Sequence, residues 1–120
     1  MKNNTRHLTV QKPWGKFEQF CLNTRATVKI IHVNPHHQLS LQRHQKRNEK
    51  WIVLEGPAGI QKNKKKKWLR AGETIEIPKK TIHRLFAGKK PVKILEISYG
   101  TFEEKDIERL EDDYGRKTGH

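Results

Sequence analysis

The chain has 120 residues, of which 32% are hydrophobic, and its 26 Lys+Arg against 13 Asp+Glu give a formal net charge of +13. This length suits one domain with a modest core, and the clustering of apolar residues into short runs argues against disorder. The lone cysteine, Cys21, excludes an intrachain disulfide and any cysteine-based zinc motif. Since no apolar run reaches the length of a membrane span or a signal peptide, we expect a cytoplasmic protein that does not enter the membrane.

The predicted elements are short strands. Residues 1–11 read as a polar arm or edge strand, and residues 12–15 read as a turn. Strands rich in β-branched or alternating apolar residues are then predicted at 16–21, 26–33, 39–44, 49–55, 58–62, 67–70, 73–77, 81–86 and 92–99. Gly, Pro or Asn separates most of them at a spacing of about ten residues, a pattern typical of an all-β sandwich or barrel.

The pattern changes after Gly100. Thr101 with Glu104 three residues later resembles a helix capping box, and Ile107 and Leu110 follow three apart. This pattern predicts a short C-terminal helix. No repeat or linker is visible, so we expect a single domain over 1–120, with a core of about 12–100 and a helical tail at 101–116.

The positive charge suggests an anionic partner, either nucleic acid, an anionic membrane surface or a phosphorylated small molecule. Because no basic face is interleaved with aromatic residues, a nucleic-acid partner rests on charge alone and is not favoured. The lysine run at 64–67 is most simply a solvated hairpin tip, with a phosphate or nucleic-acid patch as the second reading.

The segment from residue 42 to residue 51 carries the most informative polar pattern. In an extended strand, Gln42, His44 and Lys46 would share one face. Glu49 follows a short turn, and His83 lies on a later strand. Imidazole nitrogen, carboxylate oxygen and amide oxygen together suit a divalent ion such as zinc, manganese, iron or cobalt. The pattern therefore predicts a metal site.

Two segments with this chemistry resemble the paired motifs of the cupins. The first runs Gln42-x-His44, four residues, Glu49, six residues, Gly56, and the second runs Gly72, five residues, Pro78, four residues, His83. Further segments resemble the type II phosphomannose isomerase domain, which usually forms the C-terminal part of bifunctional mannose-1-phosphate guanylyltransferase/mannose-6-phosphate isomerases. They are KPWG at 12–15, LSLQRH at 39–44, RNEKWIV at 47–53, IP at 77–78, HRL at 83–85 and EDDYGR at 111–116.

The resemblance implies a cupin jelly-roll β-barrel that interconverts mannose 6-phosphate and fructose 6-phosphate and so feeds GDP-mannose and polysaccharide synthesis. It also implies a divalent metal ion held by Gln42, His44, Glu49 and His83. This ligand set resembles the zinc ligands of the type I isomerases, so zinc is expected before manganese, cobalt or iron. A homodimer formed by strand exchange or sheet packing is expected as well. The nucleotide-transferring domain of the bifunctional enzymes, with its Gly-rich loop, is absent from this sequence, so we expect no guanylyltransferase activity from it. A separate guanylyltransferase is a candidate partner. We expect no membrane partner and take a sugar phosphate as the anionic partner.

The chain departs from the family pattern at named positions, with Lys46 and Lys50 for His, His36 and Lys80 for Gly, and Ala87 for Asn. These departures favour an alternative, a non-catalytic or divergent metal-binding cupin that binds a phosphosugar or a protein partner.

Aldose–ketose isomerisation moves a proton between C1 and C2, and therefore needs a base. We take Lys46 and Glu96 as the candidate bases. Glu96 reads equally well as a paired strand carboxylate. Arg47 and Lys46 are the candidate contacts for the substrate phosphate.

Overall fold

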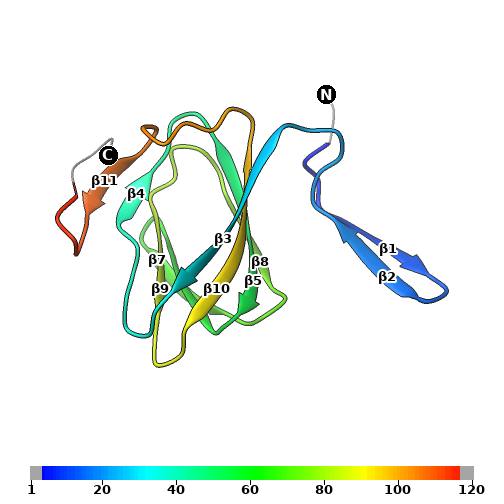
Figure 1. The fold of residues 1–120 in the computed structure, drawn as a ribbon, viewed down its shortest axis with the longest axis horizontal. Coiled ribbons are helices and arrows are strands. Elements are labelled where there is room, and N and C mark those ends of the chain that lie inside the picture. The colour runs from blue at the N-terminus through cyan, green and yellow to red at the C-terminus, as the bar shows by residue number, and fades with distance from the viewer. Residues whose placement is uncertain (1–3, 117–120) are drawn as a thin grey trace.

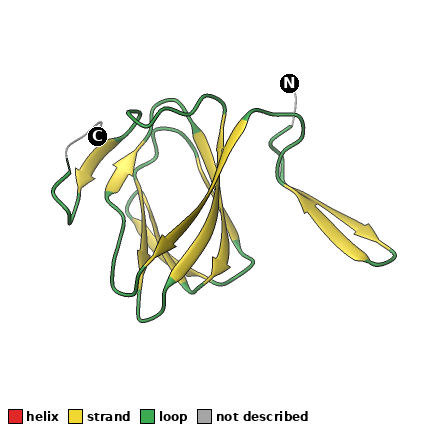
Figure 2. Ribbon diagram, viewed as in Figure 1, coloured by secondary structure: helices red, strands yellow, loops and turns green. Residues whose placement is uncertain are grey.

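The computed structural model describes residues 4–116, which form eleven strands in three sheets and contain no helix (Figures 1 and 2). The strands are β1 (Leu8–Lys12), β2 (Gly15–Gln19), β3 (Ala26–Val33), β4 (Leu41–Arg43), β5 (Asn48–Glu55), β6 (Ala58–Lys62), β7 (Lys65–Leu69), β8 (Thr74–Ile77), β9 (His83–Ala87), β10 (Val92–Tyr99) and β11 (Glu108–Glu111). The predicted all-β class is confirmed. The ends of the expected 1–120 domain, residues 1–3 and 117–120, lie outside the described residues.

Two sheets form the body of the molecule. Their strand orders are β3-β10-β5-β8 and β11-β4-β9-β6-β7, and they enclose a barrel-like interior (Figure 1). Twelve buried apolar side chains pack between them: Val33, Trp51, Val53, Ala58, Ile60, Leu69, Ile75, Ile77, Leu85, Ala87, Val92 and Ile94. Burial of this apolar surface is the main stabilisation of such a fold.

The interior is apolar at one end and polar at the other, and β10 shows why. Its side chains alternate, so Val92, Ile94, Glu96 and Ser98 all point inward and are buried. The first two belong to the apolar core, while the last two lie beside Glu49 of β5. One strand therefore supplies both the core and a wall of a buried polar site.

The predicted C-terminal helix is wrong. Residues 108–111 instead form β11, which pairs with β4 by setting Glu108 against Arg43 and Arg109 against Gln42. A helix of about two turns is marginal in water on its own. Pairing with β4 supplies long-range backbone hydrogen bonds, and an ion pair of 2.6 Å joins Arg43 Nε to Glu108 Oε1. Tertiary pairing therefore overrides the local helical pattern.

The hairpin formed by β1 and β2 projects from the body (Figure 1). The described residues contain no helix that is long and apolar enough to cross a membrane.

Two of the family departures lie at strained backbone positions. His36 has a φ of 61° and Lys80 a φ of 69°, in the left-handed region where glycine is favoured. A glycine at either position would adopt this φ without the steric cost of a Cβ. Lys80 is exposed, and its backbone N–H donates to the His44 carbonyl, a bond that glycine would keep.

Lys80→Gly should therefore raise the free energy of unfolding by about 1 kcal/mol, because glycine adopts this φ without the steric cost of a Cβ. Urea denaturation measures the change. The neighbouring Lys79 does not have a positive φ, so Lys79→Gly should lower the free energy of unfolding by about 0.5–1 kcal/mol. Equal destabilisation by both substitutions would contradict this account.

Candidate metal centre

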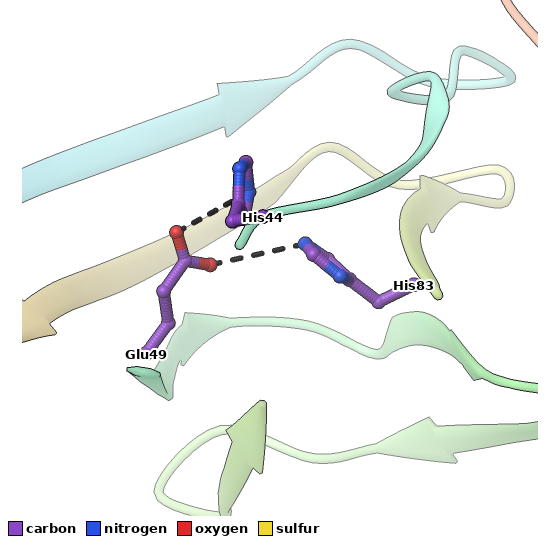
Figure 3. A group of neighbouring side chains, drawn as sticks. All are labelled: His44, Glu49 and His83. Atoms are coloured by element: carbon purple, nitrogen blue, oxygen red, sulfur yellow. Dashed lines mark ion pairs between the residues drawn. The ribbon is translucent and has the colours of Figure 1, made fainter. Parts of the chain in front are cut away.

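Three buried side chains meet at the polar end of the barrel. Glu49 comes from β5, His83 begins β9, and His44 lies just after β4. Their exposed fractions are only 2%, 2% and 3%. One ligand atom from each lies within 4.8 Å of the others, and Figure 3 shows both imidazoles directed toward the carboxylate. The structure thus brings together three of the four predicted ligands.

Backbone carbonyls set the tautomer of both histidines. His44 Nδ1 lies 2.6 Å from the Asp106 carbonyl oxygen, and His83 Nδ1 lies 2.8 Å from that of Thr81. A carbonyl oxygen only accepts hydrogen bonds, so each Nδ1 carries the hydrogen. Burial lowers the pKa of each histidine to about 4, which leaves both rings neutral at pH 7. Each Nε2 therefore presents a lone pair.

Both Nε2 atoms lie near the Glu49 carboxylate, and the one on His44 also accepts a hydrogen bond from Arg47 Nη2 at 3.2 Å. His44 Nε2 lies 3.5 Å from Glu49 Oε2, and His83 Nε2 lies 3.8 Å from Glu49 Oε1. Glu49 Oε1 is buried and has no hydrogen-bond partner among residues 4–116. Two neutral imidazoles, oriented by carbonyls, and one carboxylate make a donor set that fits a divalent cation. The cluster of His44, Glu49 and His83 can therefore hold a metal ion.

Arg47 lies inside this cluster and partly neutralises it. Its Nε donates to Glu49 Oε2 at 2.8 Å, and its Nη2 lies 3.2 Å from His44 Nε2. The guanidinium carbon also lies 4.3 Å from the centre of the Phe102 ring, within the range of a cation–π contact. Arg47 was predicted to bind a substrate phosphate, and the structure shows it paired with Glu49.

A pocket of about 230 Å³ borders the cluster, and Gln42, Arg47 and Glu96 are among its lining residues. Glu96 accepts hydrogen bonds from Trp51 Nε1 and Ser98 Oγ at 3.3 and 3.5 Å. Burial, together with the nearby Glu49 charge, raises the pKa of Glu96 to about 7. A carboxyl group that titrates near neutral pH is suited to accept and return a proton.

Gln42 and Lys46 are placed differently. Gln42 lies directly opposite His83 across β4 and β9, and its amide donates to Ser40 Oγ at 3.0 Å. Its role as a fourth ligand stays a prediction. Lys46 is exposed, and its Nζ lies 3.3 Å from Glu103 Oε2. Lys46 therefore does not share the face on which Gln42 and His44 both lie near His83, because β4 ends at Arg43 and the alternation of an extended strand does not continue into the turn.

Two other family departures also lie outside the cluster. Lys50 is buried on the opposite side of β5 from Glu49, and its Nζ pairs with Glu76 Oε1 at 3.2 Å. Ala87 is the last residue of β9 and packs in the apolar core. Neither residue is in the metal-binding cluster.

The sequence did not reveal the part played by Asp106. Its carboxylate accepts the backbone N–H groups of Gln45 and Lys46 at 2.8 and 3.0 Å, while its carbonyl orients His44. Burial acts to raise the pKa of Asp106, but these backbone donors outweigh it and hold the pKa below its usual value. No local pattern marks such a contact, since about sixty residues separate its partners in the chain.

The fold and this donor set define a cupin with a candidate metal centre. The sequence model of the mannose-6-phosphate isomerase C-terminal family matches residues 1–112, so the chain belongs to that family. It is 42% identical over 112 residues to the alginate biosynthesis protein AlgA of Pseudomonas aeruginosa, covering 92% of this chain and 23% of AlgA. It is 40% identical over 112 residues to the mannose-1-phosphate guanylyltransferase ManC of Salmonella typhimurium, with the same coverage.

Solved structures agree on the cupin fold. The capsular polysaccharide assembling protein CapF from Staphylococcus aureus matches with a TM-score of 0.66 at 19% identity, over 88% of this chain and 33% of CapF. A cupin 2 conserved barrel domain protein from Salinispora arenicola matches with a TM-score of 0.59 at 17% identity, over 83% and 79% of the two chains. The chain spans about a quarter of the length of the curated relatives that it matches.

The buried titratable groups predict how stability depends on pH in chelator-treated protein. The pKa of His44 and of His83 is about 4 in the folded protein and about 6.5 in the unfolded chain, so stability falls as the pH drops from 6.5 to 4. Glu96 acts in the opposite direction, because its folded pKa of about 7 exceeds its unfolded value of about 4.5. Each group contributes about 3 kcal/mol over this interval.

The wild type should therefore lose about 3 kcal/mol of unfolding free energy between pH 7 and pH 4, and Glu96→Gln should lose about 6 kcal/mol. Urea titrations at intervals of one pH unit measure both curves. Parallel curves for the two proteins would show that Glu96 does not take up a proton in this range.

Proposed function

We propose that this protein is a metal-dependent isomerase that interconverts mannose 6-phosphate and fructose 6-phosphate and so feeds GDP-mannose and polysaccharide synthesis. The observation that carries the proposal is the buried cluster of His44, Glu49 and His83, which lies beside Glu96, a carboxyl group with a pKa near neutrality. A metal-binding donor set next to a group that can move a proton is what an aldose–ketose isomerase requires.

Each residue has a defined part in this proposal. His44, Glu49 and His83 hold the ion, with Gln42 as the fourth ligand and zinc as the first choice of metal. When bound, a divalent ion polarises the substrate carbonyl and stabilises the oxyanion. Glu96 takes the proton from one carbon and returns it to the next. It is preferred to Lys46, whose ammonium group lies at the surface beside Glu103.

Arg47 keeps the Glu49 carboxylate oriented through its 2.8 Å ion pair. A direct contact of Arg47 or Lys46 with the substrate phosphate would require each to leave the carboxylate that it now contacts. The names of the relatives, an alginate biosynthesis protein and a mannose-1-phosphate guanylyltransferase, support a role in supplying mannose units for polysaccharides. A separate guanylyltransferase is then a proposed partner, and the single free cysteine suits a cytoplasmic setting.

The small pocket favours a second candidate function, a binding cupin without catalysis. Its volume of about 230 Å³ lies below the usual size of small-molecule sites, about 300–1,000 Å³. Phe102 is among its lining residues, with Lys29 Nζ 4.1 Å and the Arg47 guanidinium carbon 4.3 Å from the ring centre. A protein that kept the metal site and lost turnover would have these features.

Metal analysis combined with a mannose 6-phosphate assay separates the two functions. The purified wild type should contain about one divalent ion per chain and turn over the substrate. Glu49→Gln and His83→Ala should lose the metal. Glu96→Gln should retain the metal but reduce kcat by about 10²–10⁴-fold, the usual contribution of a general base.

The matched control is Lys46→Gln, which changes a surface charge near the site and should leave kcat within about twofold of the wild-type value if Glu96 is the base. Metal without turnover would favour the binding function. A wild type without metal, together with unchanged stability in His44→Ala, would rule out the metal site.

We also propose that the protein is a homodimer. The projecting hairpin has one apolar face, formed by Leu8, Val10 and Phe17, and one polar face that includes Thr9. On the body, Val28 and Ile30 of β3 are 58% and 52% exposed on the outer side of the four-stranded sheet. A two-stranded hairpin is marginally stable alone, so exchange of hairpins between two copies would cover both apolar surfaces.

Val10→Asp should therefore shift the protein from dimer to monomer, because a charge would enter the apolar face of the hairpin. Sedimentation velocity at several concentrations measures the effect. Thr9→Asp, one residue away on the polar face, should leave the dimer intact. A wild type that remains monomeric at the highest concentration would contradict the proposal.

A further inference from the structure

A second, larger pocket lies on the hairpin of β6 and β7. It has a volume of about 590 Å³ and is lined by Ile60, Asn63 and the four lysines Lys62, Lys64, Lys65 and Lys67. Ile60, Lys62, Lys65 and Lys67 share the face of the hairpin that continues into the barrel interior, because Lys62 pairs with Lys65 and the buried Ile60 pairs with Lys67. Lys66 has the opposite parity, and its ammonium group lies 5.9 Å from the centre of the Phe86 ring.

The strand register aligns this pocket with the metal centre. Gln42 pairs with His83, His83 pairs with Lys62, and Lys62 pairs with Lys65. These paired residues form one row across β4, β9, β6 and β7, which runs from the predicted metal ligands to the lysines of the pocket. Neighbouring strands are about 4.8 Å apart, so Lys62 and Lys65 lie about one and two strand spacings from His83.

The turn of this hairpin is tied to the same strand. Asn63 has a φ of 56°, which asparagine tolerates, and its N–H donates to the Ile82 carbonyl at 2.6 Å. Ile82 immediately precedes His83. The position of the lysines relative to the metal-binding cluster is thus held by backbone hydrogen bonds.

The pocket gathers several like charges on one short hairpin. Lys62 and Lys65 lie directly opposite each other, an arrangement of like charges that destabilises a sheet. Elsewhere Lys29, Lys50 and Lys93 each contact a carboxylate. Across residues 4–116, by contrast, the ion pairs include none with Lys62, Lys64, Lys65 or Lys67. A bound anion would remove this repulsion.

We propose that Lys62, Lys65 and Lys67 form the subsite for the phosphate group of a hexose phosphate whose carbonyl end reaches the cluster of His44, Glu49 and His83. This inference rests on the proposed function for the identity of the substrate, but not for the existence of an anion site. A phosphate dianion matches several ammonium donors, whereas Lys46 and Arg47 already contact carboxylates. A pocket with this charge selects a phosphate ester over a free sugar, because only the ester carries a dianion for the lysines to bind.

The test compares the full-length, metal-loaded wild type with the triple variant Lys62→Gln/Lys65→Gln/Lys67→Gln and with Lys66→Gln. Lys66→Gln is the matched control, since it removes one charge from the same hairpin on the other face. Calorimetric titration with inorganic phosphate and with mannose 6-phosphate gives both affinities, and steady-state kinetics gives KM and kcat. Thermal melts confirm that the variants are folded.

The triple variant should bind mannose 6-phosphate and inorganic phosphate at least about tenfold more weakly, with KM raised and kcat much less affected, because each charge-assisted hydrogen bond contributes to binding. Lys66→Gln should match the wild type. Unchanged phosphate affinity in the triple variant, or an equal loss in Lys66→Gln, would overturn the proposal.

Inorganic phosphate separates this proposal from the proposed function. If the wild type does not turn over mannose 6-phosphate, isomerase activity fails, yet phosphate binding that is lost only in the triple variant still supports the subsite. If the wild type binds neither ligand, the subsite is overturned whatever the metal content. A short single-stranded oligonucleotide tests the alternative that these lysines bind nucleic acid. If the wild type and the triple variant bind it equally, the lysines do not form a nucleic-acid site, and the phosphate subsite is supported.

Discussion

The buried carboxylate of Glu49 is the constraint around which the polar end of the barrel is arranged. Removing a charge from water costs several kcal/mol unless partners replace the lost hydration. Arg47 supplies a 2.8 Å ion pair to one oxygen, while the other faces His83 and has no hydrogen-bond partner in the described part of the chain. Arg47 therefore offsets part of the cost of burying Glu49, and it leaves the Oε1 side of the carboxylate suited to bind a cation.

The surrounding segments act mainly to orient this group. Carbonyls of Thr81 and Asp106 hold the two imidazoles, and the Asp106 carboxylate fixes the turn between His44 and Arg47. The segment after β10 therefore completes the site as well as extending the five-stranded sheet through β11. Because four distant parts of the chain converge here, the cluster depends on the whole fold.

Much of the fold could be predicted from short patterns. The segments 26–33 and 92–99 match β3 and β10, because β-branched residues and alternating polarity act locally. The region 101–116 could not be predicted in this way, since the free edge of β4 is absent from any local window. His44, Glu49 and His83 were found through motif spacing, whereas Asp106 has no spacing that marks it as a partner of His44.

By itself, the sequence determined the all-β class, the cupin family and the three residues that meet in the buried cluster. Each follows from local alternation or from fixed spacing within a motif. The tertiary structure alone decided that Lys46 points to the surface, that residues 108–111 join a sheet and that Lys62 lies beside His83. These outcomes depend on strand register and on where a strand ends, which are set by pairing between segments far apart in the chain.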